Sequence, residues 1–423
     1  MPRSLFVLAL VIAQGCAVGA VDLVGKRCSN EHPCPAPLVC DSASAVCVSM
    51  PSVDPSCHLF DDENPITCTR RELYVAPDGD DGRDGLSAAA AWASIDVGKL
   101  APGDRVHLAA GTYGRPLFSA ETSVDGTKTC PIEILGPDVR GSGPFAEITQ
   151  PIVLGAAAYW FHDLRFALSG DKGAFAVNFV HNIRLERLVF RNHYTARSYA
   201  RDVSAVGADN LAVLSSDFDS DDGQVMDLGG TDDVLIRGNR FAGRDAAQVE
   251  LGARARVLEN EFFGAWGTPI TGRTEATGTV ERNLFHDIVC AHCVIAQNMG
   301  LVRANTFVSA DGAFAADNGV FRDNIVLGLA GGTKKSAAEA MGAYNLYSDV
   351  AAPYGSGAPD ATDRMGAPGL GADFVPSASS PAVDQGDPAR AVPPGGGMRA
   401  DIGALERGAT RLPDGRYCTA DGL

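Results

Sequence analysis

A short phrase recurs through the middle of this 423-residue chain, and its regular spacing limits the possible folds more than any other feature. Each copy alternates apolar and polar residues, and five of the eight copies then place an asparagine two positions before their last residue, which is phenylalanine in every copy except the final one. Alternation with β-branched residues, as in Val234 and Ile236 against Leu235 and Arg237, is typical of strands rather than helices. The copies end at Phe166, Phe190, Phe218, Phe241, Phe262, Phe285, Phe307 and Val326.

The repeat length of about 22 residues predicts one coil of a parallel β-solenoid, because three short strands and three turns use that many residues. We expect the phenylalanines to stack along the core. We also expect each asparagine to take the left-handed conformation of a tight turn and to hydrogen-bond to its counterpart in the next coil. The asparagines of this predicted ladder are Asn239, Asn260, Asn283, Asn305 and Asn324.

Leucine-rich repeats are the main alternative, but they need several leucines per unit, and the unit that ends at Phe262 has only Leu251 and Leu258. Two end motifs favour the β-helix: YVAPDGD at 74–80, and SPAVDQGD at 380–387 followed by DIGALE at 401–406. With the repeat, they make the chain similar to the pectate-lyase-like right-handed parallel β-helix superfamily. The resemblance implies an all-β, right-handed parallel β-helix over 71–345 with a closing segment at 346–408 and a tail at 409–423. It leaves the chemistry open, because this superfamily includes lyases, hydrolases and proteins without known activity.

The amino terminus predicts export. Arg3 and the apolar run Leu5–Ala13 form a signal segment within residues 1–20, too short for a permanent membrane span. Cleavage after Ala20 and lipidation of Cys16 at a degraded lipobox are both open. The mature chain is then expected to be extracellular or in the cell envelope, without a transmembrane span.

Eleven cysteines are present, and removing Cys16 with the signal or as a lipid anchor leaves an even ten. Residues 21–70 lack apolar periodicity, so they predict a small module held by disulfides, whose pairing is open. We expect Cys290 and Cys293 to form another bridge at a coil corner. Cys130 and Cys418 remain and could link the tail to an early coil. The cysteines of the amino-terminal module are Cys28, Cys34, Cys40, Cys47, Cys57 and Cys68.

The net charge of −17 with only six lysines argues against nucleic-acid binding, which needs a dense cationic surface. A polysaccharide or a cell-envelope ligand is the expected partner, and the protein is expected to be a monomer.

Two carboxylates are predicted to meet on the outside of the solenoid. If Met226 and Val249 point inward, Asp227 and Glu250 point outward in adjacent coils about 4.8 Å apart. Such carboxylates repel unless a proton or a cation joins them, and calcium suits hard oxygen ligands in an exported protein. The alternative is a solvated acidic column relieved by Arg273.

The longest repeat, between Phe190 and Phe218, holds a basic and aromatic insertion one coil before Asp227. Polysaccharide β-elimination needs a base and a charge that stabilises the enolate, and aromatic rings stack on sugars. A surface loop with salt bridges is the alternative. The candidate catalytic residues are His193, Tyr194, Arg197 and Arg201, and the candidate substrate-binding residues are Tyr199 and Arg273.

Two functions remain open. One is a non-catalytic β-helix protein that binds polysaccharide or another extracellular ligand, favoured by the lack of an intact catalytic motif. The other is a calcium-dependent lyase of an acidic polysaccharide, favoured by the insertion beside Asp227 and Glu250.

Overall fold

Two compact units divide the chain, residues 1–58 and 59–423. In the first, β1 (Leu38–Asp41) pairs antiparallel with β2 (Val46–Ser49) and places Cys40 opposite Cys47. Each unit is described separately. The computed structural model describes residues 38–41, 46–49, 68–118, 124–127, 129–139, 143–194, 200–220, 224–252, 254–272, 278–289, 294–308, 314–316, 319–328, 342–350, 360–390, 398–405, 410–411 and 417–418.

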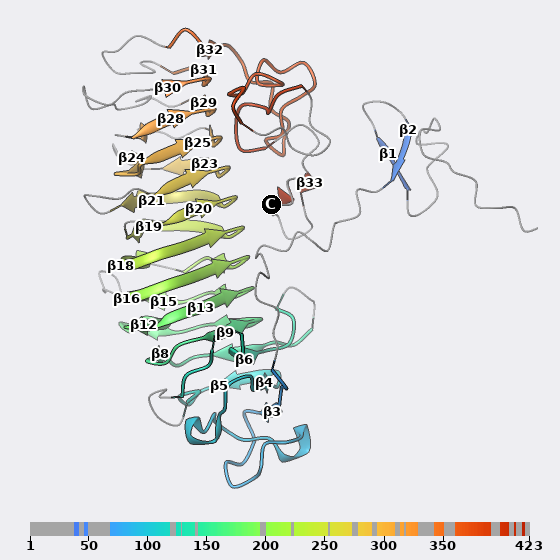
Figure 1. The fold of residues 1–423 in the computed structure, drawn as a ribbon, viewed down its shortest axis with the longest axis vertical. Coiled ribbons are helices and arrows are strands. Elements are labelled where there is room, and N and C mark those ends of the chain that lie inside the picture. Colours follow the sequence, from blue (N-terminus) through green and yellow to red (C-terminus); the bar gives the residue numbers. More distant parts are fainter. Residues whose placement is uncertain are drawn as a thin grey trace, which may run out of the picture. The chain divides into compact units, whose positions relative to one another are not determined.

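The second unit contains a parallel β-solenoid, as the repeat predicts (Figure 1). Each strand pairs in parallel with the strand at the same place in the next coil, so the strands form three ladders, which we call A, B and C in chain order. Ladder A carries the start of each repeated phrase, ladder B its phenylalanine, and ladder C the segment that follows. Helical structure in the described residues is limited to two 3-10 turns, η1 (Ala88–Ala90) and η2 (Val97–Lys99).

Four long strands bend from one ladder into the next. β16 (Arg201–Leu214) and β18 (Gln224–Arg237) run from ladder C into ladder A, whereas β19 (Arg240–Leu251) and β21 (Glu261–Gly272) run from B into C. The other strands of ladder A are β3 (Glu72–Val75), β4 (Arg105–Leu108), β6 (Ile132–Leu135), β9 (Tyr159–His162), β13 (His181–Glu186), β20 (Arg256–Leu258), β22 (Thr279–Glu281), β25 (Leu301–Arg303), β28 (Val320–Arg322) and β30 (Gly342–Ala343).

The remaining strands complete the other two ladders and two small pairs. Ladder B has β5 (Gly111–Tyr113), β7 (Ala146–Ile148), β10 (Leu164–Phe166), β14 (Val189–Phe190), β17 (Asp217–Phe218), β23 (Leu284–Val289), β26 (Thr306–Val308), β29 (Ile325–Leu327), β31 (Leu346–Ser348) and β32 (Arg364–Met365). Ladder C has β8 (Ile152–Leu154), β12 (Phe175–Asn178), β24 (Val294–Gln297) and β27 (Phe314–Ala316). The small pairs are β11 (Ser169–Gly170) with β15 (His193–Tyr194), and β33 (Thr410–Arg411) with β34 (Tyr417–Cys418).

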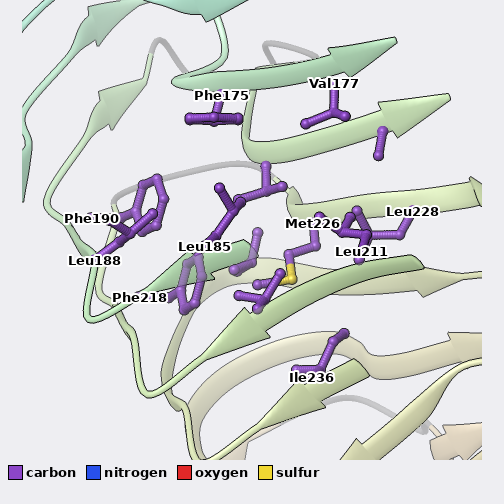
Figure 2. Packing of buried hydrophobic residues seen from close by; sticks show 14 of the residues in the cluster. Phe175, Val177, Leu185, Leu188, Phe190, Leu211, Phe218, Met226, Leu228 and Ile236 are labelled. Carbon is purple, nitrogen blue, oxygen red and sulfur yellow. The ribbon is translucent and has the colours of Figure 1, made fainter. Parts of the chain in front are cut away.

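The phenylalanines of ladder B stack as predicted. Neighbouring rings from Phe166 to Phe307 lie 4.6 to 4.9 Å apart between centroids and within 16° of parallel. This spacing equals the distance between coils, so each ring packs on the same ring of the next coil. Figure 2 shows Phe190 and Phe218 facing Met226 of ladder C and Ile236 of ladder A across the interior.

The asparagine ladder is also confirmed, and it extends one residue further, to Asn345. Each side-chain amide donates to the amide oxygen of the next asparagine at 2.9 to 3.1 Å, and Asn345 donates to Asp363. The prediction that the asparagine itself is left-handed is wrong. The preceding residue takes the positive φ, for example Glu259 at 58° and Arg282 at 55°, because the buried asparagine must turn its side chain along the stack.

The closing segment packs against the last coils of ladder B. Ala404 donates its N–H to the Thr306 hydroxyl at 2.9 Å, and Gly403 donates to the carbonyl of Asp323 at 2.7 Å. Phe374 lies on the ring of His286, with centroids 4.8 Å apart. Among the described residues, no helix is long and apolar enough to cross a membrane.

Candidate functional site

The outer face of ladder C carries the carboxylates that the sequence singles out. Val203, Met226 and Val249 are fully buried on the inner face, so the residues that follow them point outward. The register aligns Asp227 with Glu250 in adjacent coils. In the described residues, the outward column is Val153, Ala176, Ser204, Asp227, Glu250, Thr271 and Gln297.

Arg201 supplies a positive charge beside this pair. Its Nε lies 3.2 Å from Oδ2 of Asp227, and its side chain is only 15% exposed. The backbone of Arg201 is held as well, because its carbonyl accepts the N–H of Ala174 at 2.9 Å. A guanidinium in this ion pair reduces the repulsion between Asp227 and Glu250. It acts as a fixed charge and hydrogen-bond donor, not as a proton acceptor.

A calcium ion needs more oxygen ligands than the carboxylates of Asp227 and Glu250 supply. Calcium takes about six to eight oxygen ligands, whereas two carboxylates meet here and the first has an arginine partner. In the part of the chain that the structure describes, no group of three or more His, Cys, Asp or Glu side chains is placed to hold a metal ion. Calcium binding by Asp227 and Glu250 stays a prediction.

The insertion after Phe190 is anchored at both ends by buried polar residues that sequence reasoning missed. Asn192 and Asp202 are fully buried, and the Asn192 amide donates to Asp202 at 2.6 Å. Ser220 donates its hydroxyl to the same Asp202 oxygen at 2.8 Å. These hydrogen bonds close the insertion next to Arg201 and so fix the position of Arg201 beside Asp227.

The other predicted site residues have different outcomes. His193 and Tyr194 form β15, which pairs with β11, and the His193 side chain is exposed. Nothing in their placement tests a catalytic role. Outside the described residues lie Arg197, Tyr199, Arg273, Cys16, Cys28, Cys34, Cys57, Cys290 and Cys293.

An exposed aromatic residue lies at the end of ladder C. Phe179 is 80% exposed and packs over Gly207, where an added Cβ would lie 2.7 Å from the Phe179 ring. Val206 beside it is half exposed and belongs to the same outer face as Ser204. The phrase pattern gave no signal for Phe179, because this residue falls outside the repeat's phenylalanine position. An exposed aromatic face suits a sugar, which has apolar ring faces and polar edges.

A second cluster, which the sequence also did not predict, lies on ladder A. His162 bridges Glu133 and Asp163, with Nε2 3.0 Å from Glu133 and Nδ1 2.8 Å from Asp163. Arg187 binds Asp163, and Arg70 binds Glu133. Burial alone would raise the pKa of Glu133, but hydrogen bonds from His162 and Arg70 outweigh burial and hold that pKa below its usual value.

These contacts make the ladder A cluster structural rather than catalytic. His162, Glu133 and Asp163 are each less than 10% exposed, and each has a charged or hydrogen-bonding partner. Perturbed pKa values in a cleft can mark a site, but ion-pair networks perturb them equally. The face around Arg201, Asp227, Glu250 and Phe179 is therefore the better candidate.

No protein-family model matches the sequence, and no curated protein matches it either. Solved structures are similar at low identity. A pectate lyase is 16% identical, with a TM-score of 0.44 over 81% of this chain and 97% of that chain. A rhamnogalacturonan lyase is 14% identical, with a TM-score of 0.44 over 69% of this chain and 90% of that chain.

A mannuronic-acid-specific lyase of polysaccharide family 6 from the human gut microbiota is 17% identical, with a TM-score of 0.40 over 67% of this chain and 74% of that chain. The fold that the sequence resemblance implies, a parallel β-helix, is the fold that the strand register itself shows.

Proposed function

We propose that this chain is an exported or cell-surface protein that binds a polysaccharide along the outer face of ladder C. The observation that carries the proposal is the outer face of ladder C, which holds the charged row of Arg201, Asp227 and Glu250 and, at the carboxyl end of β12, the exposed ring of Phe179. The ring offers a flat apolar surface, and the charged row offers donors and acceptors at the spacing of the coils.

The charge of the row favours binding over catalysis. Arg201 is held in an ion pair with Asp227, so it presents charge to a ligand but is not poised to remove a proton. The guanidinium and the two carboxylates of the row can donate to and accept from the hydroxyl groups of a sugar. The calcium-dependent lyase remains the second candidate, with His193 as its candidate base in the described part of the insertion.

A polysaccharide panel tests both candidates with the full chain. Polygalacturonate, alginate and chondroitin would each be cast into native gels, with calcium or with chelator, and the retardation of the protein measured. We expect at least one polymer to retard the protein, without any rise in ultraviolet absorbance from unsaturated product in solution. Product formation would replace the binding proposal with the lyase. Absence of both retardation and product with all three polymers would contradict both candidates.

A further inference from the structure

Cys68 precedes β3, the first strand of the solenoid, and its sulfur lies next to Gly103, which has no side chain to displace it. The Sγ atom lies 3.9 Å from the carbonyl oxygen of Thr129, to which its S–H donates. Gly103 has a φ of 88°, and a Cβ added there would lie 2.7 Å from the Cys68 sulfur. The sulfur therefore packs in a fixed place, directly against the residue that precedes Cys130.

Cys130 follows Thr129, the residue that the Cys68 sulfur contacts, and it is held in a tight turn with Thr127. Its N–H donates to the carbonyl of Thr127 at 2.9 Å, and Thr127 donates back to the carbonyl of Cys130 at 3.0 Å. The Thr127 hydroxyl accepts from the same Cys130 N–H at 3.1 Å. Both cysteines are thiols in this structure.

The two thiols interact directly. Burial raises the pKa of the Cys68 thiol, and a side-chain hydrogen bond with Cys130 raises it further. That contact needs sulfur atoms close to each other, as a disulfide does. Cys68 and Cys130 both belong to the unit 59–423, so their contact does not depend on where the amino-terminal unit lies.

We propose that Cys68 and Cys130 form a structural disulfide that closes the early coils of the solenoid into a covalent loop. The oxidant is a small-molecule or protein disulfide. One cysteine thiolate attacks it, forms a mixed disulfide and releases one thiol. The second cysteine then attacks the mixed disulfide, the Cys68–Cys130 bond forms, and a second thiol leaves. The chain loses two hydrogens, and the oxidant gains them.

The proposed bond changes which cysteines are left to pair with one another. Sequence analysis assigns Cys68 to the amino-terminal module and leaves Cys130 for Cys418, whereas this bond would join Cys68 to Cys130. The module then keeps five cysteines, an odd number, so one of them must stay reduced or find a partner beyond the module. The loop encloses β3, β4 and β5, and a bond across it restricts the unfolded chain.

Peptide mapping tests the bond on the purified full chain after equilibration with reduced and oxidised glutathione. Free thiols are alkylated before a protease that cuts after Asp and Glu is added. Trypsin is unsuitable, because residues 28–70 contain no internal Lys or Arg cleavage site and hold six cysteines. The acid-specific protease instead gives 64–72, whose only cysteine is Cys68, and 126–133, whose only cysteine is Cys130.

We expect these two peptides joined, with a mass about 2 Da below their sum. Alkylated Cys68 and Cys130, or Cys68 joined to any other cysteine, would overturn the proposal. In Cys130→Ser, peptide 64–72 should appear alkylated and the melting temperature should fall by a few degrees, whereas Cys418→Ser should keep the linked pair. The proposal draws on export for its oxidant in the cell, but this experiment supplies the oxidant, so its outcome is independent of polysaccharide binding.

Discussion

Asn283 shows how single residues hold this solenoid together. It is fully buried, and its side-chain amide donates to the carbonyls of Val257 and Glu281 at 2.8 and 3.0 Å and to Asn305 at 3.0 Å. Its amide oxygen accepts both the backbone and the side-chain N–H of Asn260 at 2.9 Å. A buried amide with every hydrogen-bonding group satisfied is stabilising, and its loss removes the side-chain partner of backbone groups in two coils and of the Asn305 side chain in a third.

Replacing Asn283 should therefore be costly. We expect Asn283→Leu to lower the free energy of unfolding by about 3 kcal/mol, because several buried donors and acceptors lose their partner together. Urea unfolding followed by circular dichroism measures the change. The matched control is Asn178→Leu at an exposed strand end, which should change stability by less than about 0.5 kcal/mol. Equal losses in the two variants would refute a ladder role for Asn283.

At the scale of elements, the repeat predicts the stacks of equivalent residues in successive coils. It does not predict contacts between residues that occupy different positions in the repeat. The asparagine and phenylalanine stacks recur at one spacing, so parallel register brings them together without further information. Phe179, and the Asn192, Asp202 and Ser220 anchor, lie outside that spacing. Each of these contacts is made once in the chain, so it leaves no repeating pattern from which the sequence could predict it. The sequence predicts the left-handed conformation one position too late, because asparagine adopts that conformation more readily than most residues. In the structure the asparagine is buried in the ladder, and the residue before it is left-handed.

The ladder A cluster joins β6, β9 and β13 and should make stability depend on pH. Burial would lower the pKa of His162, but hydrogen bonds to Asp163 and Glu133 raise it. Its contribution is therefore complete below the unfolded value of about 6.5 and is lost as pH rises through the raised pKa. The pKa values of Glu133 and Asp163 are lowered, so their contribution is lost as pH falls through those values from about 4.

The stabilisation by this network should peak between about pH 4.5 and 6.5. We expect His162→Gln to cost about 1 kcal/mol at pH 5.5 and less at pH 8.5, measured by urea unfolding at both pH values. Arg70, Arg105, Arg187 and Glu186 also face the cluster. His181→Gln, at an exposed position, is the control. A cost of His162→Gln that grows with pH would contradict this network.

At the scale of the whole molecule, the proposed binding face lies on a different ladder from the stacks that stabilise the fold. Ladders A and B are held by the asparagine and phenylalanine stacks and by ion pairs across neighbouring coils, and the closing segment packs on the last coils of ladder B. Ladder C presents Ser204, Asp227, Glu250 and Thr271 outward in one column, and Phe179 is exposed at the carboxyl end of β12 in the same ladder. A long ligand with repeating units can follow such a column from coil to coil.

The most direct test of this account compares two exposed apolar residues of the same unit. Phe179 is 80% exposed beside ladder C, and Leu86 is 54% exposed in the loop after β3. With the polysaccharide that retards the protein, we expect Phe179→Ala to weaken binding by about five- to tenfold through lost stacking. Leu86→Ala should bind like the unaltered chain, and both variants should keep its melting temperature. Unchanged affinity in Phe179→Ala, or an equal loss in both variants, would contradict ladder C as the binding face.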